Sequence, residues 1–492
     1  MNLCKFFFVN NFHKTKHNIS FSANSTIKNA RLNNLLNRFC QLLKKNKMEI
    51  ISIGGYDQVG KNMTAVKIGE DVFLFDMGLY IPAVIELQEE KIKDYGERHL
   101  RRKEALPDDL ILDKMGLREK VRAIFLSHGH LDHIGAVPYI AYRYNAPVLG
   151  SPFTISVLKR TMEDEKKTIP NKIITVPQDG SYKIKGKNAE YVVEFIHMTH
   201  SIPHTTMVVL HTPEGAVIYG NDFKLDQTPI LGNPPNFSAL KRISKQGVKA
   251  LIIDSLYCGS ETKTPSEDVA REMIKDVFAG MRGSKNAIFV STFSSHIARL
   301  KSIIEFGKKL DREIVFIGRS LRRYVQASND IGVVNFTNDV NMVTYKNQVS
   351  SMFRKISADR DKYLVICTGH QGEPGSILDR LSRRRLPFEF QRNDNLVFSS
   401  KTIPVPINIK NKGEMDGRFK RYGVRIFDQV HVSGHGGRED LREIISLISP
   451  QHVIPSHGSY QQLLPMKELA IEMGYKPNVD FHLLRNGGKV VL

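Results

Sequence analysis

Short apolar runs that end in a glycine or a polar residue recur between residues 48 and 257, and this pattern predicts a series of buried strands. Examples are Glu49–Ile53, Met63–Ile68, Val72–Phe75, Val121–Leu126, Met207–Leu210, Ala216–Tyr219 and Ala250–Ile253. The glycine-rich turn between the first two runs favours an antiparallel start to a sheet. Residues 82–120 are charged and mixed, so we interpret them as a helical insertion that forms either a solvated surface or a dimer contact.

A second pattern occupies residues 258–429, where predicted strands and helices alternate. The predicted helices are Glu267–Met281, His296–Leu310 and Ile377–Arg384, and the predicted strands are Ala287–Ser291, Ile314–Gly318 and Tyr363–Cys367. Such alternation implies a parallel, doubly wound α/β sheet that forms a separate domain. From residue 430 the first pattern returns, with apolar runs that end in Ser433-Gly434-His435 and Ser456-His457-Gly458, each before a helix. We therefore predict one domain at 48–257 and 430–492, interrupted by an α/β domain at 258–429.

Residues 1–47 differ from the rest of the chain, because they hold nine basic residues and no acidic residue. Three interpretations remain open: translation upstream of a true start at Met48, an organellar targeting peptide, or a basic arm that binds nucleic acid. We favour the first and expect most of this extension to be disordered or absent from the native protein, because the strand pattern begins immediately at Met48.

The net charge of +20 indicates a polyanionic partner. Residues 258–429 hold 30 basic and 19 acidic residues, so they carry +11, while residues 1–47 carry +9 and the remainder is balanced. No apolar run is long enough to cross a membrane. The four cysteines form no CxxC pair, which favours a reduced, cytoplasmic protein.

A cluster of metal-binding side chains, His128, His130, Asp132 and His133, directly follows the predicted strand Val121–Leu126. We expect it on a strand-to-helix loop, where its side chains can converge on a two-metal site, with zinc as the first candidate and manganese as an alternative. Two further candidate ligands, His200 and Asp222, also follow predicted strands. Asp76 ends another buried strand, and such an acid needs a partner, so we expect it to orient a metal ligand or a water molecule.

The order of these residues resembles the metallo-β-lactamase superfamily, and the resemblance implies an αββα sandwich. One metal would be held by His128, His130 and His200, the other by Asp132, His133 and His457, and Asp222 would bridge them. Two zinc ions in such a site would lower the pKa of water toward about 7, which supports hydrolysis. The metals alone do not distinguish a phosphodiester from a lactone, a thioester or a β-lactam.

The inserted domain resembles that of the β-CASP nucleases. In that family an acid at a strand end, here Asp254, accompanies a histidine in a Ser-Gly-His context, here His435. The resemblance implies that His435 contacts the scissile phosphate and helps to protonate the leaving 3′ oxygen. A histidine at position 457 is typical of the branch that acts on RNA.

Within this group, residues 48–492 are similar to the ribonuclease J family, and the chain length resembles its shorter archaeal branch. The resembling motifs include Gly60-Lys61-Asn62-Met63, His200-Ser201-Ile202-Pro203, Gly220-Asn221-Asp222-Phe223-Lys224, Ser291-Thr292-Phe293-Ser294-Ser295, Gly318-Arg319-Ser320 and Gln371-Gly372-Glu373. The resemblance implies degradation of single-stranded RNA from 5′ to 3′, a preference for 5′-monophosphate ends and some internal cleavage, in RNA processing and decay. It also implies a homodimer and RNA-decay partner proteins.

By the same resemblance, a phosphate pocket would involve Ser294, His370, Gln371, Gly372, Gly436 and Gly437. His370 departs from the family, which carries a small residue before Gln371. The basic runs at 319–323 and 383–385 are predicted to contact the RNA backbone, and Arg319 is counted among the phosphate- or RNA-binding residues.

Two other functions remain as alternatives. The first is a small-molecule metallo-hydrolase of the same fold, although such an enzyme would not need the basic insert. The second is a non-catalytic RNA-binding subunit, although every inferred ligand position is filled. A dinucleotide-binding fold is disfavoured, because the loop after Tyr363–Cys367 lacks the GxGxxG motif.

Overall fold

A computed structural model describes residues 47–89, 96–403 and 405–492. The predictions made for residues 1–46 therefore lie outside the described residues. None of the described helices is long and apolar enough to span a membrane.

The first of three sheets contains the strands on either side of the histidine cluster. Its strand order is β19 (Lys489–Val491), β1 (Met48–Gly54), β2 (Met63–Ile68), β3 (Asp71–Phe75), β4 (Val121–Leu126), β5 (Val148–Gly150) and β6 (Ile173–Thr175). Strands β2 and β3 pair antiparallel, whereas β3, β4, β5 and β6 run parallel. As a result, the chain leaves β3 and β4 at the same edge of the sheet.

The second sheet joins segments that are far apart in the sequence. Its order is β18 (His452–Ser456), β11 (Val248–Asp254), β10 (Ala216–Gly220), β9 (Thr206–His211), β8 (Glu190–His197) and β7 (Ser181–Lys185). Strands β10, β11 and β18 are parallel. Their carboxyl ends therefore bring Asp222, Asp254 and His457 to one edge, although the inserted sheet separates β11 from β18 in the chain.

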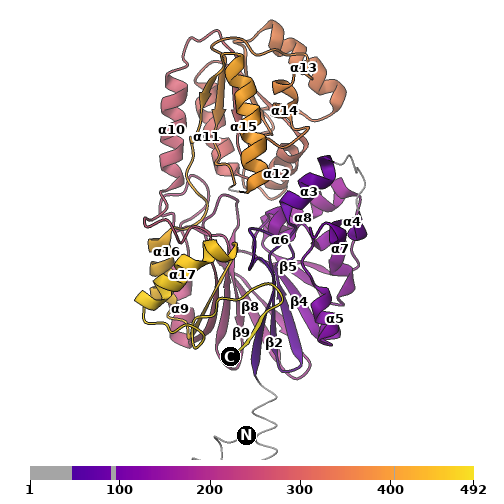
Figure 1. Ribbon diagram of the computed structural model, residues 1–492, viewed down its shortest axis with the longest axis vertical. Coiled ribbons are helices and arrows are strands. Elements are labelled where there is room, and N and C mark those ends of the chain that lie inside the picture. The colour runs from indigo at the N-terminus through magenta and orange to yellow at the C-terminus, as the bar shows by residue number, and fades with distance from the viewer. Residues whose placement is uncertain (1–46, 90–95, 404) are drawn as a thin grey trace, which may run out of the picture. The chain divides into compact units, whose positions relative to one another are not determined.

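These two sheets pack face to face, with helices on both outer sides. Buried aromatic rings fill the space between the sheets, with Phe125 against Phe195 and Phe75 against Tyr219. Figure 1 shows α3 (Ile81–Glu89), α4 (Glu97–Arg102), α5 (Leu110–Lys114), α7 (Val137–Ile140) and α8 (Pro152–Glu165) on one side. The other side carries α9 (Phe237–Gln246), α16 (Arg438–Ile448) and α17 (Tyr460–Glu472). The four layers form the αββα sandwich that the family resemblance implied.

The interpretation of residues 82–120 as a possible solvated surface is wrong for the part that is described. Helices α3, α4 and α5 each bury a leucine, Leu87, Leu100 and Leu112, in the core beside the first sheet. Between α4 and α5, Glu104 and Asp108 are exposed, but Asp109 is fully buried and pairs with Arg101 and Arg143. The described part of this segment therefore covers the sheet with the buried side chains of its helices.

The third sheet lies within the predicted α/β insertion. Its order is β14 (Asn341–Val343), β13 (Glu313–Ile317), β15 (Tyr363–Cys367), β12 (Ile288–Ser291), β16 (Asn395–Phe398) and β17 (Arg425–Phe427), and all strands are parallel. Neighbouring residues of one strand belong to different hydrophobic cores, Phe316 to the first core and Val315 to the second. Both faces of the third sheet are therefore covered, as in a doubly wound fold. The covering helices are α10 (Glu267–Ala279), α11 (Ile297–Lys308), α12 (Arg319–Asp330), α13 (Lys346–Ala358), α14 (Ile377–Ser382) and α15 (Pro406–Arg421).

One buried arginine connects the segments where the chain enters and leaves this third sheet. Arg299 is fully buried and donates two hydrogen bonds, of 2.6 and 2.9 Å, to the carboxylate of Glu267 at the start of α10. It also donates to the carbonyl oxygens of Ser399 and Val430. Glu267 lies where the chain enters the third sheet, and Val430 lies where the chain returns to the sandwich. The Arg299 side chain therefore holds these two connecting segments together.

Candidate active site

The histidine cluster follows β4 directly, but the expected loop is partly helical. Asp132 and His133 lie in α6 (Leu131–Ile134), a short helix whose first residues follow His130. The backbone N–H of His133 donates to the carbonyl oxygen of His130 at 3.0 Å. This turn places the ring of His133 only 4.0 Å from the ring of His128, measured between centroids.

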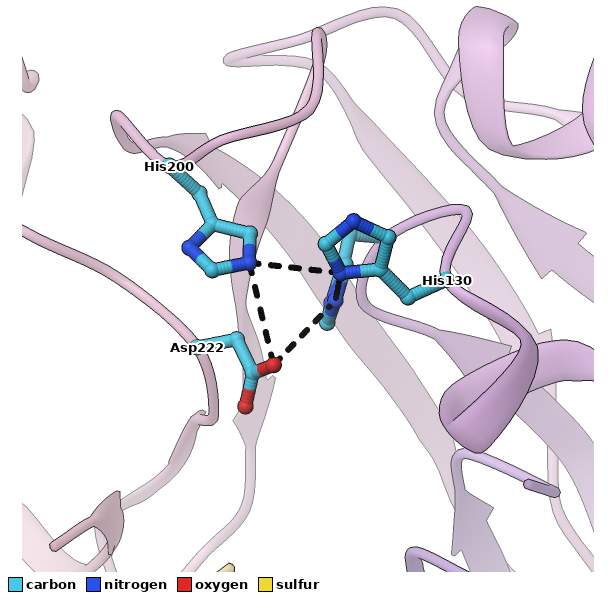
Figure 2. Close-up of side chains that lie close together, drawn as sticks. His130, His200 and Asp222 are labelled. Carbon is cyan, nitrogen blue, oxygen red and sulfur yellow. Dashed lines mark hydrogen bonds and ion pairs between the residues drawn. The ribbon is translucent and has the colours of Figure 1, made fainter. Parts of the chain in front are cut away.

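Four side chains form the first candidate ligand set: His128, His130, His200 and Asp222. Figure 2 shows His130 and His200 facing Asp222 from different segments of the chain. The distance from Nδ1 of His130 is 3.0 Å to Nε2 of His128 and 3.3 Å to Nε2 of His200. The Oδ2 atom of Asp222 lies 3.5 and 3.8 Å from Nε2 of His128 and His200.

The second candidate set consists of Asp132, His133, Asp222 and His457. Nε2 of His133 lies 3.2 Å from Oδ2 of Asp222 and 3.6 Å from Oδ2 of Asp132. Nδ1 of His457 lies 3.5 Å from Oδ1 of Asp222. Asp222 therefore contributes one carboxylate to both sets: its Oδ2 atom faces His128, His133 and His200, and its Oδ1 atom faces His457.

These residues fit a pair of divalent metal ions. The Oδ1 atom of Asp222 is buried and has no hydrogen-bond partner among the described residues. Several imidazole nitrogens of these sets face one another. Zinc sites are typically formed by four ligands of this kind, imidazole nitrogens and carboxylate oxygens. A bound cation would therefore satisfy buried polar atoms that the protein leaves without partners.

Electrostatics keeps most of these ligands in the form that binds metal. Burial lowers the pKa of His130 and His200, so both rings are neutral at pH 7. Burial alone would raise the pKa of Asp222, but the neighbouring His133 and His457 hold it well below its usual range. The pKa of His133 is raised well above its usual value, because Asp222 and Asp132 outweigh the effect of its burial. Metal binding at His133 therefore requires the loss of a proton.

Asp76 lies behind His133 and orients its ring. Its Oδ2 atom is 2.6 Å from Nδ1 of His133, and its carboxylate also accepts hydrogen bonds from the backbone N–H and the hydroxyl of Ser127, both at 2.8 Å. Asp76 is fully buried. The Nδ1 contact directs the other ring nitrogen, Nε2, toward Asp222, an arrangement that matches the positioning role expected of Asp76.

Asn62 is a site residue to which the sequence analysis assigned no role. Its side-chain nitrogen lies 3.0 Å from Nε2 of His133, and its side-chain oxygen lies 3.1 Å from Nδ1 of His457. Asn62 belongs to the Gly60-Lys61-Asn62-Met63 motif, which was the only local signal for it.

His435 and Asp254 form a second functional unit beside the ligand sets. Nδ1 of His435 is 2.7 Å from Oδ2 of Asp254, and the His435 ring lies 5.0 Å from that of His200 and 5.4 Å from that of His457. Burial alone would lower the pKa of His435, but the carboxylates of Asp254 and Asp222 raise it to about 9. The ring is therefore a cation at pH 7 and can donate a proton.

A cleft of about 910 Å³ connects the ligand sets with the third sheet. His130, Asp132, Asp222, His435 and His457 line it from the sandwich. Residues from the inserted domain line the other side, and Nε2 of His130 lies 3.0 Å from the hydroxyl of Ser295. Ser433 of the Ser433-Gly434-His435 motif also lines the cleft, together with Tyr257 and Lys401, for which no motif of the sequence predicted a role.

Three of the residues expected in a phosphate pocket, Ser294, His370 and Gln371, line this cleft, and so does Arg319 of the first basic run. His370 is the most notable, because it is buried and neither of its ring nitrogens has a hydrogen-bond partner among the described residues. Its ring packs against Phe293 at 4.3 Å. The side chain of Gln371, in contrast, bonds to the backbone of Lys401 and Ile403, so it shapes the wall of the cleft.

The three glycines expected in the pocket have other contacts. The backbone N–H of Gly436 donates to the carbonyl oxygen of Phe223, and that of Gly437 donates to the carboxylate of Asp440. Gly372 lies against the backbone of Asn411 and Lys412, where a side chain would clash. None of the three lines the cleft, and the amides of Gly436 and Gly437 are engaged, so the expected phosphate contacts at these glycines are not supported by the geometry.

Comparison with known proteins identifies the family of this chain. Three family models match the chain: the metallo-β-lactamase superfamily at residues 56–252, the β-CASP domain of ribonuclease J at 285–412, and the Zn-dependent metallo-hydrolase RNA specificity domain at 422–479. Ribonuclease J of Methanocaldococcus jannaschii is 41% identical over 443 residues, which cover 90% of this chain and 98% of that protein. The chain belongs to the ribonuclease J family.

Other members of the ribonuclease J family and one solved structure extend the comparison. Ribonuclease J of Pyrococcus abyssi is 38% identical over 90% of this chain and 96% of its own length. Ribonuclease J 1 of Streptococcus pyogenes is 27% identical over 92% of this chain and 75% of its own. A crystal structure of a protein of unknown function from Enterococcus faecalis V583 superposes with a TM-score of 0.59 and 17% identity, over 91% of this chain and 100% of that one. This last likeness concerns the fold alone.

Proposed function

We propose that this protein is a metal-dependent ribonuclease that hydrolyses single-stranded RNA from 5′ to 3′ and prefers 5′-monophosphate ends. The observation that carries the proposal is the position of the His435–Asp254 pair beside two ligand sets that share Asp222. Membership of the ribonuclease J family and the charge of +11 on residues 258–429 support RNA as the substrate.

Two metal ions, with zinc as the first candidate and manganese as the alternative, would bind in the two ligand sets. One ion would be held by His128, His130 and His200, and the other ion by Asp132, His133 and His457. Asp222 would contribute to the binding of both ions. Such ions supply a nucleophilic water at neutral pH and stabilise the charge that develops on a phosphoryl oxygen. Asp76, which contacts Nδ1, would keep the ring of His133 in the orientation that metal binding at Nε2 requires.

His435 would act as the general acid. Hydrolysis breaks the bond between phosphorus and the 3′ oxygen of the upstream nucleotide, and the departing oxygen then needs a proton. The His435 ring is cationic, lines the cleft and is held at Nδ1 by Asp254, which leaves its Nε2 proton available. The products are a free 3′ hydroxyl on the upstream nucleotide and a 5′ phosphate on the downstream RNA.

A phosphate pocket beside the metal centre would select 5′-monophosphate ends. We assign it to Ser294, Arg319 and His370. Burial lowers the pKa of His370, so its ring is neutral and one of its two unpartnered nitrogens can donate an N–H to a phosphate, while the guanidinium of Arg319 supplies positive charge. A 5′ triphosphate would be too large and too highly charged for contacts arranged around one phosphate, so exonuclease action would start from monophosphorylated ends, while internal cleavage would not need the pocket.

We also propose a cytoplasmic homodimer that acts in RNA processing and decay together with partner proteins. Among the described cysteines, Cys258 and Cys367 are free and buried, which suits a reducing compartment. Light scattering coupled to size-exclusion chromatography would test the dimer, because a monomer mass at micromolar concentration would contradict it.

The decisive experiment is cleavage of RNA labelled at its 5′ end. One substrate carries a 5′ monophosphate and the other a 5′ triphosphate, and both are incubated with the wild-type protein and with an Asp132→Ala, His133→Ala variant. Release of labelled mononucleotide from the monophosphate substrate alone, lost in the variant, is the expected result. Internal fragments from both substrates would indicate an endonuclease. The absence of metal-dependent cleavage would overturn the proposal and favour a small-molecule hydrolase or an RNA-binding subunit.

A further inference from the structure

A small cavity of about 110 Å³ lies where α12 and α13 begin, at the carboxyl ends of the parallel strands β13 and β14. In open parallel sheets this edge is the usual place for ligands. Asp164, Arg319, Arg323 and Thr344 line both this cavity and the active-site cleft. The cavity is therefore a continuation of the cleft toward the N-termini of α12 and α13.

The basic residues of this region differ in how their charge is balanced. Arg323 is paired with Asp164 at 2.6 Å, and Arg160 is paired with Asp330 at 2.8 Å. Arg319 and Lys346, in contrast, have no hydrogen-bond or ion-pair partner within the described part of the chain. Both are exposed and line the cleft. Two cations at the mouth of the active site are thus free to bind an anion.

Tyr345 lies next to these cations with its ring in solvent. Its exposed fraction is 59%, so its ring contributes little to the protein core. Arg322 contacts this side chain: its guanidinium carbon is 5.9 Å from the ring centroid, and one of its nitrogens is 3.4 Å from the tyrosine hydroxyl. An exposed aromatic ring among basic side chains, along a groove, is the arrangement by which proteins bind single-stranded nucleic acid.

We propose that Arg322, Tyr345 and Lys346 form an RNA-binding platform outside the metal centre, next to Arg319 of the phosphate pocket. A base of the substrate stacks on the ring of Tyr345, and the phosphate beside that base binds Lys346. Arg322 holds the ring from the side and adds positive charge beside the base. This inference rests on the proposed ribonuclease function and specifies how the enzyme would hold RNA nucleotides that extend beyond the cleaved bond.

Two pairs of variants test the platform. Tyr345→Ala is compared with Tyr142→Ala, which removes a tyrosine that is 53% exposed on the sandwich domain. Lys346→Ala is compared with Lys355→Ala, which removes an equal charge from the same helix about 13 Å away, nine residues on at ~1.5 Å each. The substrates are 5′-monophosphorylated RNAs of about three and about twenty nucleotides, because only the longer strand can occupy the cleft and the platform together.

Tyr345→Ala is expected to raise KM for the long RNA by about 5- to 150-fold, because the stacking of one base is lost. KM for the trinucleotide should change much less. Lys346→Ala is expected to lower the slope of log affinity against log salt by about 0.7, the contribution of one phosphate on a single strand. Tyr142→Ala and Lys355→Ala should leave both quantities at the wild-type value. Equal values of KM for Tyr345→Ala and the wild type, or equal losses on both RNA lengths, would overturn the platform.

Binding experiments separate the platform from the proposed catalysis. The same substitutions are placed in the Asp132→Ala protein, and the affinity for the long RNA is measured by fluorescence anisotropy with each metal ion added. If the wild-type protein cleaves no RNA but Tyr345→Ala still weakens binding relative to Tyr142→Ala, the platform stands and the catalytic proposal fails. If cleavage occurs and binding is unchanged by Tyr345→Ala and Lys346→Ala, the platform fails and the catalytic proposal stands.

Discussion

Nδ1 of His435 lies 2.7 Å from a carboxylate oxygen of Asp254, although 181 residues separate the two in the chain. Asp254 ends β11, and His435 follows the segment by which the chain returns from the third sheet. The α/β insertion therefore begins and ends beside the metal site. The charge of His435, the proposed general acid, therefore depends on Asp254, which precedes the insertion in the chain.

Asp254→Asn should lower kcat on RNA by about 10²- to 10⁴-fold, the usual contribution of a general acid, with a smaller effect on KM. A neutral amide cannot stabilise the cationic form of His435, so the proton donor is lost at neutral pH. Metal content, measured by mass spectrometry of the purified protein, should stay at the wild-type level. If the metals disappear together with the activity, Asp254 acts as a ligand rather than through His435.

Asp222→Ala should lose both metal ions, because this carboxylate belongs to both ligand sets. His200→Ala should lose mainly one ion and His457→Ala mainly the other, since each belongs to a single set. The measurement is the metal-to-protein ratio after dialysis against buffer with a weak chelator. Equal ratios in all three variants would contradict the shared role of Asp222.

Asp76→Asn should weaken metal binding by about 10- to 100-fold, the usual cost of removing a carboxylate that orients a histidine ligand. The amide can still reach Nδ1 of His133, but it does not provide the same charge. Titration of the metal-free protein with zinc would measure the change. Asp71→Asn is the matched control, since Asp71 lies at the other end of β3 and bonds to Arg122. A similar loss in the control would point to damage to the strand rather than to ligand orientation.

Glu267→Gln should destabilise the protein at pH 7 by about 3–5 kcal/mol, because it leaves Arg299 buried without its counter-charge. Burial alone would raise the pKa of Glu267, but His296 and Arg299 hold it well below the ordinary value of 4.5. A depressed carboxyl pKa contributes stability that is complete above about pH 4.5 and is lost as the pH falls below it.

The difference in urea midpoint between wild type and Glu267→Gln should therefore be largest at neutral pH and narrow below about pH 4.5. Glu305→Gln is the control, because the carboxylate of Glu305 is 37% exposed and its pair with Arg271 should contribute about 0–1 kcal/mol. A midpoint difference that does not change with pH would show that the ionisation of Glu267 is not what stabilises the fold.

Much of the fold and of the candidate ligand sets could be predicted from the sequence, because the signals are local. The ligands His128, His200 and Asp222 each follow an apolar strand within a few residues, and the ends of strands are where side chains face a cleft. The alternation of strands and helices after Glu267 likewise depends only on the spacing of apolar residues, which is why it predicted the parallel sheet. Helix α12 was interpreted only as a basic run, although its buried residues Leu321, Tyr324, Val325 and Ser328 follow helical spacing.

The partners of these residues were decided only by the tertiary structure. Asn62 reaches both His133 and His457, and Arg299 bonds to Glu267 and Val430, contacts between segments that no local pattern relates. The glycines at 436 and 437 carried a family signal, yet their amides are engaged by the protein itself. Local sequence determines which residue types lie at the strand ends, because hydrophobic spacing is a property of neighbouring residues. Hydrogen bonds and charge balance depend on what the rest of the chain brings near, so only the folded protein determines which polar groups remain free to bind metal or RNA.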